Sequence, residues 1–158
     1  MSILRDADVE TKAVEEESAV IDWTSKLGRE AKRLLAREYF VWFTTVASDL
    51  SPQPRPVWFI WDHDSVLVYS QAWTHKVQHV SAHPRAALHF NADDEAEGRV
   101  VIFVGTARID PEQAPAHLVA KYMRKYRSGI QGLGMTPQQF SKEYSVAIRI
   151  TPTSLRSG

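Results

Sequence analysis

A strand pattern gives way to a helix pattern in the stretch SVLVYSQAWTHKVQH, residues 65–79. The apolar segment Val66–Tyr69 predicts a buried strand, and the residues from Thr74 onward predict a short helix that Pro84 ends. Because Thr74 is a suitable N-cap, the free backbone N–H groups of the first helical turn are expected to point outward as anion donors. Lys76 lies in the same turn. The strand, the hydroxyl-lined turn, the helix start and the lysine together predict a phosphate site.

The composition limits the classes of protein and of site. The chain has 158 residues, of which 44% are hydrophobic and 24% charged, as is typical of a soluble globular domain. Its 19 basic and 19 acidic residues give a net charge near zero, which argues against a nucleic-acid surface. Cysteine is absent, and the histidines have no recognised ligand spacing with a carboxylate partner, so we expect no metal site. No apolar run approaches the roughly 20 residues of a membrane span, and the acidic N-terminus is unlike a secretory signal, so we expect a cytoplasmic protein without membrane contact.

The pattern of residues predicts a flexible acidic arm over residues 1–22 and a single domain over residues 23–158. A helix capped by Thr24 is expected to run to about Glu38. Six strands are expected at 39–48, 54–61, 65–70, 85–91, 99–109 and 145–150, with a polar hairpin at Asp93–Gly98 and a bulge at Gly105. Further helices are expected at about 74–82, at 111–128 and from Thr136-Pro137, with a glycine-rich loop between the last two. Strands joined mostly by hairpins predict a closed or split barrel, because closure removes exposed strand edges.

The order of these motifs resembles that of the split-barrel flavin and deazaflavin reductases, the superfamily of pyridoxamine 5′-phosphate oxidase. The resemblance covers roughly residues 26–155 and implies a mainly β, α+β fold: a six-stranded antiparallel split β-barrel with peripheral helices. Within the superfamily, the chain is most similar to members that use the deazaflavin coenzyme F420. The motifs that carry the resemblance are PRPVWF (54–59), YSQ (69–71) followed by Thr74-x-Lys76, HPRAALHF (83–90), VGTA (104–107) and VAIRITP (146–152).

The resemblance implies an F420-dependent oxidoreductase that transfers hydride between the coenzyme and a small conjugated organic substrate. It also implies a homodimer with the cofactor at the subunit interface. The ring is expected along the strand at Val57–Phe59, and the ribityl phosphate in the segment from Ser70 to His79. The expected cofactor-binding residues are Arg55, Val57, Trp58, Phe59, Ser70, Gln71, Thr74, Lys76, Gln78 and His79. No catalytic acid–base pair is visible, so no catalytic residue is assigned.

One departure from the family pattern bears on the cofactor. Related sequences usually carry arginine and asparagine two and three positions after the motif lysine, where this chain has Gln78 and His79. One positive charge is therefore missing from the expected phosphate site, and Arg55 and Arg85 are candidates to supply it. FMN needs a stronger phosphate clamp, usually with several arginines and lysines, so the single lysine favours F420 over FMN.

Two alternative functions stay open. The first is an FMN-dependent oxidase or reductase related to pyridoxamine 5′-phosphate oxidase, and the second is a non-catalytic flavin-, haem- or tetrapyrrole-binding protein. For the individual residues, we expect Trp58 to lie near the ring and Trp61 to lie in the core. The basic residues of the 111–128 helix are interpreted as a solvated face, with a site for the anionic oligoglutamate tail of F420 as the alternative: Lys121, Arg124, Lys125 and Arg127.

Overall fold

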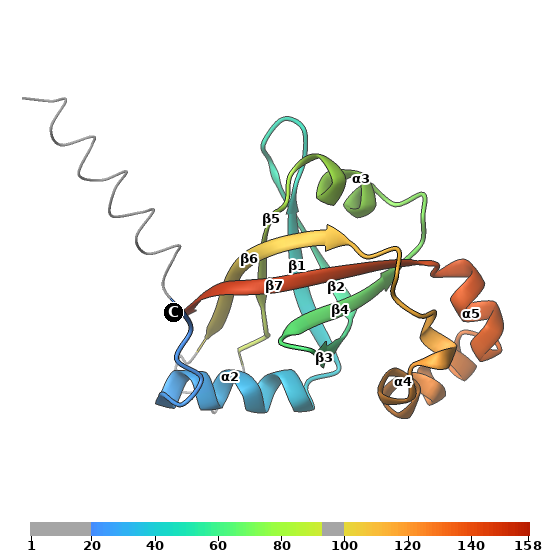
Figure 1. Ribbon diagram of the computed structural model, residues 1–158, viewed down its shortest axis with the longest axis horizontal. Coiled ribbons are helices and arrows are strands. Elements are labelled where there is room, and N and C mark those ends of the chain that lie inside the picture. Colours follow the sequence, from blue (N-terminus) through green and yellow to red (C-terminus); the bar gives the residue numbers. More distant parts are fainter. Residues whose placement is uncertain (1–19, 93–99) are drawn as a thin grey trace, which may run out of the picture.

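In the computed structural model, which describes residues 20–92 and 100–158, the chain forms a curled seven-stranded sheet flanked by helices (Figure 1). The predicted hairpin at Asp93–Gly98 lies outside the described residues, as do residues 1–19 of the predicted N-terminal arm. All neighbouring strands are antiparallel, in the order β2-β1-β5-β6-β7-β4-β3. The strands are β1 (Phe40–Val46), β2 (Pro52–Trp58), β3 (Ile60–Asp62), β4 (Ser65–Ser70), β5 (Arg85–His89), β6 (Val101–Ile109) and β7 (Val146–Ser157).

The two edge strands of this sheet, β2 and β3, follow one another in the chain and are separated by Phe59 alone. The sheet must therefore curl until its two edges meet at Phe59, which gives a split barrel and confirms the predicted fold class. The strand count differs from the prediction, because the segment expected as one strand at 54–61 is divided into β2 and β3. The register of β6 on β7 shifts at Val104/Gly105, as predicted. A Cβ on Gly105 would lie 2.2 Å from the Thr151 carbonyl oxygen, so the bulge needs glycine.

The helices pack around the curled sheet (Figure 1). Helix α2 (Lys26–Arg37) is capped by Ser25, whose hydroxyl accepts from the Gly28 N–H at 3.0 Å. Thr24 was the predicted cap, but its N–H and hydroxyl both donate to Asp22 instead. None of the helices in the described ranges is long and apolar enough to cross a membrane. The remaining helices are α3 (His75–Ala82), the 3-10 turn η1 (Ala116–Leu118), α4 (Ala120–Gly132) and α5 (Pro137–Glu143), the last starting at Thr136-Pro137 as predicted.

The prediction of one helix at 111–128 is wrong. Pro115 precedes η1, and the residue before a proline is disfavoured in the helical region, so α4 starts only at Ala120. Helix α4 then continues through Gly129 and Gly132, which were expected in a loop. A Cβ on Gly129 would come within 2.3 Å of the Tyr39 hydroxyl and 2.8 Å of the Trp58 ring. Glycine at this position therefore allows α4 to approach the aromatic side chains of the sheet.

Two apolar clusters lie on either side of β4, and all six residues of this strand are buried. Val66 and Val68 belong to a cluster formed by the sheet and α2, whereas Leu67 and Tyr69 belong to a second cluster formed with η1, α4 and α5. Strand β4 is thus covered on both faces, as its unbroken apolar pattern indicates. The expected core position of Trp61 is consistent with its ring contact to Trp23, with centroids 5.3 Å apart.

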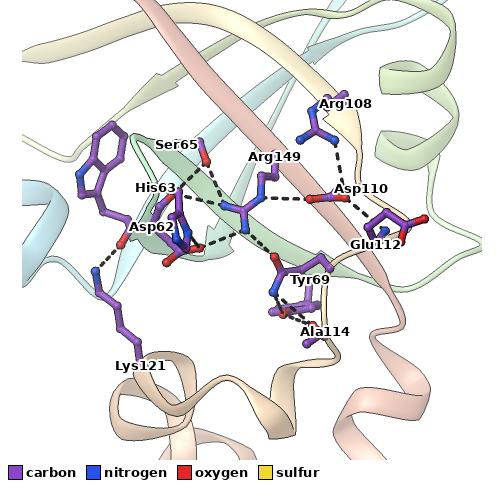
Figure 2. A network of polar contacts seen from close by, with 12 residues as sticks. Asp62, His63, Ser65, Tyr69, Arg108, Asp110, Glu112, Ala114, Lys121 and Arg149 are labelled. Atoms are coloured by element: carbon purple, nitrogen blue, oxygen red, sulfur yellow. Dashed lines mark hydrogen bonds and ion pairs between the residues drawn. The ribbon is translucent and has the colours of Figure 1, made fainter.

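A network of charges joins the start of β7 to β3, to β4 and to the segment that follows β6 (Figure 2). Arg149 is 9% exposed, and its guanidinium binds the carboxylates of Asp62 at 3.0 Å and Asp110 at 3.1 Å. It also donates to the Ser65 hydroxyl at 3.0 Å and to the side chain of Gln113. Since these partners lie at the end of β3, at the start of β4 and after β6, one arginine fixes three segments at one end of the sheet.

Candidate cofactor site

A polar cavity of about 340 Å³ lies between the β1–β2 hairpin and the start of α3. The predicted residues Arg55, Lys76 and His79 line it together with His75, so four basic side chains share one cavity. The other lining residues are Thr45, Ala47, Ser48, Asp49, Ser51 and Gln53. The structure therefore brings Arg55 of β2 close to Lys76 of α3. Arg55 was one of the two residues expected from the sequence to supply the missing positive charge.

The charges in this cavity are poorly compensated. Burial and the neighbouring charge of Arg55 lower the pKa of Lys76. Within the described part of the chain, neither Arg55 nor Lys76 forms an ion pair with a carboxylate. Asp49 lies on the wall, but its carboxylate accepts from the Ser51 hydroxyl at 2.6 Å and the Ser51 N–H at 3.0 Å, and these bonds lower its pKa. Two cations without a dedicated partner are suited to bind an anion such as a phosphate.

The turn before α3 is built differently from the prediction. Thr74 is the N-cap residue by its backbone, but its hydroxyl forms no capping hydrogen bond to the helix. The Thr74 hydroxyl instead lies 2.9 Å from that of Ser70 and donates to the Gln71 carbonyl at 3.0 Å. Gln71 extends away and donates to Glu143 of α5 at 2.8 Å. Ser70, Gln71 and Thr74 therefore hold the turn that positions Lys76, and none of them lines the polar cavity.

His79 and Gln78 occupy the two positions that depart from the family pattern. The His79 Nδ1 lies 2.9 Å from the hydroxyl of the buried Thr45, so β1 orients its ring on the cavity wall. Gln78 is exposed and does not line the polar cavity. The structure thus separates two neighbouring residues that the sequence placed in the same site.

An aromatic cavity of about 270 Å³ adjoins the polar one, and Lys76 lies on the wall of both. The predicted residues Val57 and Trp58 line it, and the Trp58 ring stacks on Tyr126 with centroids 4.7 Å apart. The other lining residues are Phe40, Pro56, Tyr69, Tyr122, Leu133, Phe140 and Tyr144. A mainly apolar cavity that opens beside a cationic one suits a ligand with a flat ring at one end and an anionic group at the other.

Phe59 is the expected ring contact that lies outside both cavities. Its side chain is fully buried in the cluster formed with α2, and its backbone N–H donates to the Tyr126 hydroxyl at 2.8 Å. Lys125 also donates to the Phe59 carbonyl at 2.9 Å. Helix α4 therefore holds the chain at the break between β2 and β3.

The basic face of α4 is only partly solvated. Burial and the nearby charge of Lys121 lower the pKa of Lys125 to about 8, and Lys121 itself donates to the Trp61 carbonyl. Arg124 and Arg127 are exposed, in agreement with a solvated face. Two of the four basic residues thus bind the backbone at the β2–β3 junction, which sequence spacing gave no means of predicting.

The aromatic wall contributed by α4 and α5 was missed as a site. Leu118, Tyr122 and Tyr126 stand at helical spacing in the sequence and form an apolar stripe, but a stripe of this kind is equally typical of core packing. The third member of that stripe, Leu118, is 66% exposed. The two tyrosines are distinguished by their contacts in the fold: Tyr126 stacks on Trp58, and Tyr122 packs against Phe140. Trp58 and Phe140 also stack on each other.

Comparison with known proteins places the chain in a family. Residues 27–157 match the sequence profile of pyridoxamine 5′-phosphate oxidase. The chain belongs to the pyridoxamine 5′-phosphate oxidase family. This membership confirms the resemblance found in the sequence, and the curled antiparallel sheet is the split barrel expected of the family. No curated protein sequence matches the chain.

Solved structures share the fold at low sequence identity. A conserved hypothetical protein from Mycobacterium tuberculosis is 19% identical with a TM-score of 0.67, covering 87% of this chain and 85% of its own. An F420 reductase is 22% identical with a TM-score of 0.60, over 79% and 94% of the two chains. The haem storage protein HutZ from Vibrio cholerae is 13% identical with a TM-score of 0.58, over 84% and 95%. Such identities show a shared fold, and the neighbours include both a reductase and a haem storage protein.

Proposed function

We propose that this protein is an F420-dependent oxidoreductase that transfers hydride between the deazaflavin coenzyme and a small conjugated organic substrate. The observation that carries the proposal is the position of Lys76, which lies on the walls of both the cationic and the aromatic cavity. A cofactor with a phosphate and a tricyclic ring would span these two cavities. The F420 reductase among the structural neighbours supports the choice of cofactor as an analogy of fold.

The chain's own residues would then divide the work of binding. Arg55 and Lys76 hold the phosphate, with His79 beside them on the wall oriented by Thr45. Val57 and Trp58 line the ring, and the stack of Trp58 on Tyr126 keeps that wall flat. The coenzyme supplies the hydride chemistry, while the protein orients the ring and excludes water from it. We further propose a cytoplasmic homodimer with the site at the subunit interface, built from a domain at 23–158 and an N-terminal arm at 1–22.

An FMN-dependent oxidase or reductase is the second candidate. The observation that favours it is Arg55, which lies close enough to Lys76 to lower the pKa of that lysine. Two neighbouring cations form a stronger phosphate clamp than the single lysine expected from the sequence. Discrimination between the cofactors therefore requires a direct comparison of their affinities.

The test is a titration of the cofactor-free protein with F420, FMN, riboflavin and haem, followed by fluorescence for the first three and by Soret absorbance for haem. We expect micromolar or tighter binding of F420, at least tenfold weaker binding of FMN, and weaker binding still of riboflavin, which lacks the phosphate. Oxidation of reduced F420 by a soluble quinone, followed by absorbance, then tests turnover. Tighter binding of FMN would support the second candidate, and binding of haem alone would overturn both enzymatic proposals.

A further inference from the structure

Three tyrosines of the cluster around α4 are buried, but their hydroxyl groups differ. The Tyr69 hydroxyl donates to the Ala114 carbonyl at 2.6 Å. The Tyr126 hydroxyl accepts from the Phe59 N–H at 2.8 Å and lies 2.7 Å from the Tyr39 carbonyl oxygen. The Tyr122 hydroxyl has no hydrogen-bond partner among the described residues, although the side chain is fully buried.

An unpartnered buried hydroxyl is costly, because removing it from water without a compensating hydrogen bond destabilises the folded state. Most buried polar groups in proteins therefore have a partner, and each exception calls for an explanation. Tyr122 is part of the wall of the aromatic cavity, where its neighbours Tyr69 and Phe140 also lie. A molecule that fills this cavity is thus the partner that the surrounding structure leaves for the hydroxyl.

We propose that the Tyr122 hydroxyl is the hydrogen-bond donor of the aromatic cavity and binds a carbonyl oxygen or ring nitrogen of a planar heteroaromatic ligand. The inference rests on the proposed function, since it assumes that the cavity receives the ring of the cofactor. Burial and the nearby tyrosines raise the pKa of Tyr122, so the hydroxyl keeps its proton at all physiological pH values. Tyr122 is accordingly a positioning and specificity residue for the ring, and not a source of protons.

The surrounding residues give this donor its selectivity. The cavity wall consists mostly of apolar and aromatic side chains, and Lys76 lies where it meets the polar cavity. A ring that carries a polar acceptor would satisfy the hydroxyl, whereas a purely hydrocarbon ring of the same shape would leave it unpartnered. Discrimination of this kind, through a buried polar group that only one ligand satisfies, is stronger than discrimination by shape alone.

The experiment compares Tyr122→Phe with the matched control Tyr126→Phe in the full-length protein, and measures thermal unfolding and ligand affinity for each. In the absence of ligand, Tyr122→Phe should leave the Tm unchanged or raise it, because it removes an unpartnered group. Tyr126→Phe should lower the Tm, because it removes a hydroxyl that binds the backbone of Phe59. With F420, FMN and riboflavin as probes, Tyr122→Phe should weaken each ring-containing ligand by about 3- to 10-fold, the effect of one neutral hydrogen bond.

Failure of the inference differs from failure of the proposed function. If the wild-type protein binds neither F420, FMN nor riboflavin, the proposed function and this inference are both overturned. If the wild-type protein binds a probe and Tyr122→Phe binds it equally well, only the role of Tyr122 is overturned. A fall in the Tm of ligand-free Tyr122→Phe without loss of affinity would also overturn it, by showing that the hydroxyl already has a structural partner.

Discussion

The Arg149 network and the polar cavity both gather charged side chains, but only the network pairs them. Arg149 binds two carboxylates, Asp62 and Asp110, at 3.0 and 3.1 Å (Figure 2). In the polar cavity, Arg55 and Lys76 lie beside each other and no carboxylate of the described residues pairs with either. The need to join three segments of the chain explains the network. Folding alone gives no reason to bring two cations together, so the cavity is better explained by a ligand.

Both regions lower a pKa, but the effect on charge is opposite: the charged form is favoured in the network and disfavoured in the cavity. Burial alone would raise the pKa of Asp62, but hydrogen bonds and charges from His63 and Arg149 outweigh it and lower the pKa. Burial lowers the pKa of Lys76, and the charge of Arg55 lowers it further. The network therefore stabilises the charged form of its carboxylate, whereas the cavity disfavours the charged form of its lysine. An anion bound in the cavity would remove that disadvantage.

The largest effect on stability is expected from Arg149→Met. The substitution removes the buried cation that Asp62 and Asp110 share and leaves them only the exposed side chains of His63 and Arg108. Loss of one partner of a buried pair typically costs about 3–5 kcal/mol. Urea denaturation measures the change in the free energy of unfolding. Arg108→Met is the matched control, because Arg108 is 64% exposed and approaches the same Asp110 at 3.6 Å. We expect the control to cost at most about 1 kcal/mol. A similar small loss for both variants would show that the network is not a structural requirement.

Lys76→Met should have the opposite profile, with a large effect on binding and little on stability. A hydrogen bond to a charged group contributes about 1.5–3 kcal/mol, so affinity for FMN or F420 should fall about 10- to 150-fold. Affinity for riboflavin, which has no phosphate, should change much less. Without ligand, the unfolding free energy should be unchanged or higher, because a partly buried cation beside Arg55 is removed.

The matched control for this variant is Lys32→Met, which removes the same charge from the exposed face of α2, away from both cavities. Its cofactor affinities should equal those of the wild-type protein. Equal affinity of Lys76→Met and Lys32→Met for FMN and F420 would show that Lys76 is a surface lysine and would remove the contrast with the network.

The sequence predicted the elements whose boundaries are set locally. Strand β4 was placed at 65–70, where it is found, because turn residues precede it and a polar segment follows it. His63 and Asp64 form that preceding turn with φ values of 50° and 56°. Lys76, Val57 and Trp58 were likewise placed near one another by the resemblance of their motifs, and the structure brings them to adjoining cavities.

The features that the sequence did not predict depend on contacts between residues far apart in the chain. The run from Val57 to Trp61 has no polar face, so nothing in it indicates that β2 ends and β3 begins at Phe59. The break is held by Tyr126 and Lys125, whose side chains bind the Phe59 backbone from 67 and 66 residues away. A lysine on an exposed helix and one that binds a distant carbonyl have the same local pattern. Only the fold distinguishes them.

The smallest expected effects concern pH: stability should rise with pH through both groups, in the acid range for Asp62 of the network and in the alkaline range for Lys76 of the cavity. The folded-state pKa of Asp62 lies below its ordinary value of 3.8, so its contribution to stability is present above pH 3.8 and is lost as the pH falls through the folded value. The folded-state pKa of Lys76 lies below 10.5, so just below pH 10.5 the unfolded chain binds more protons and stability rises with pH. Asp62→Asn should therefore flatten the acid limb of a plot of unfolding free energy against pH, and Lys76→Met should flatten the alkaline limb. Each variant serves as the control for the other on the opposite limb. If both variants flattened the same limb, or if neither flattened a limb, the distinction between paired charges in the network and unpaired cations in the cavity would not hold.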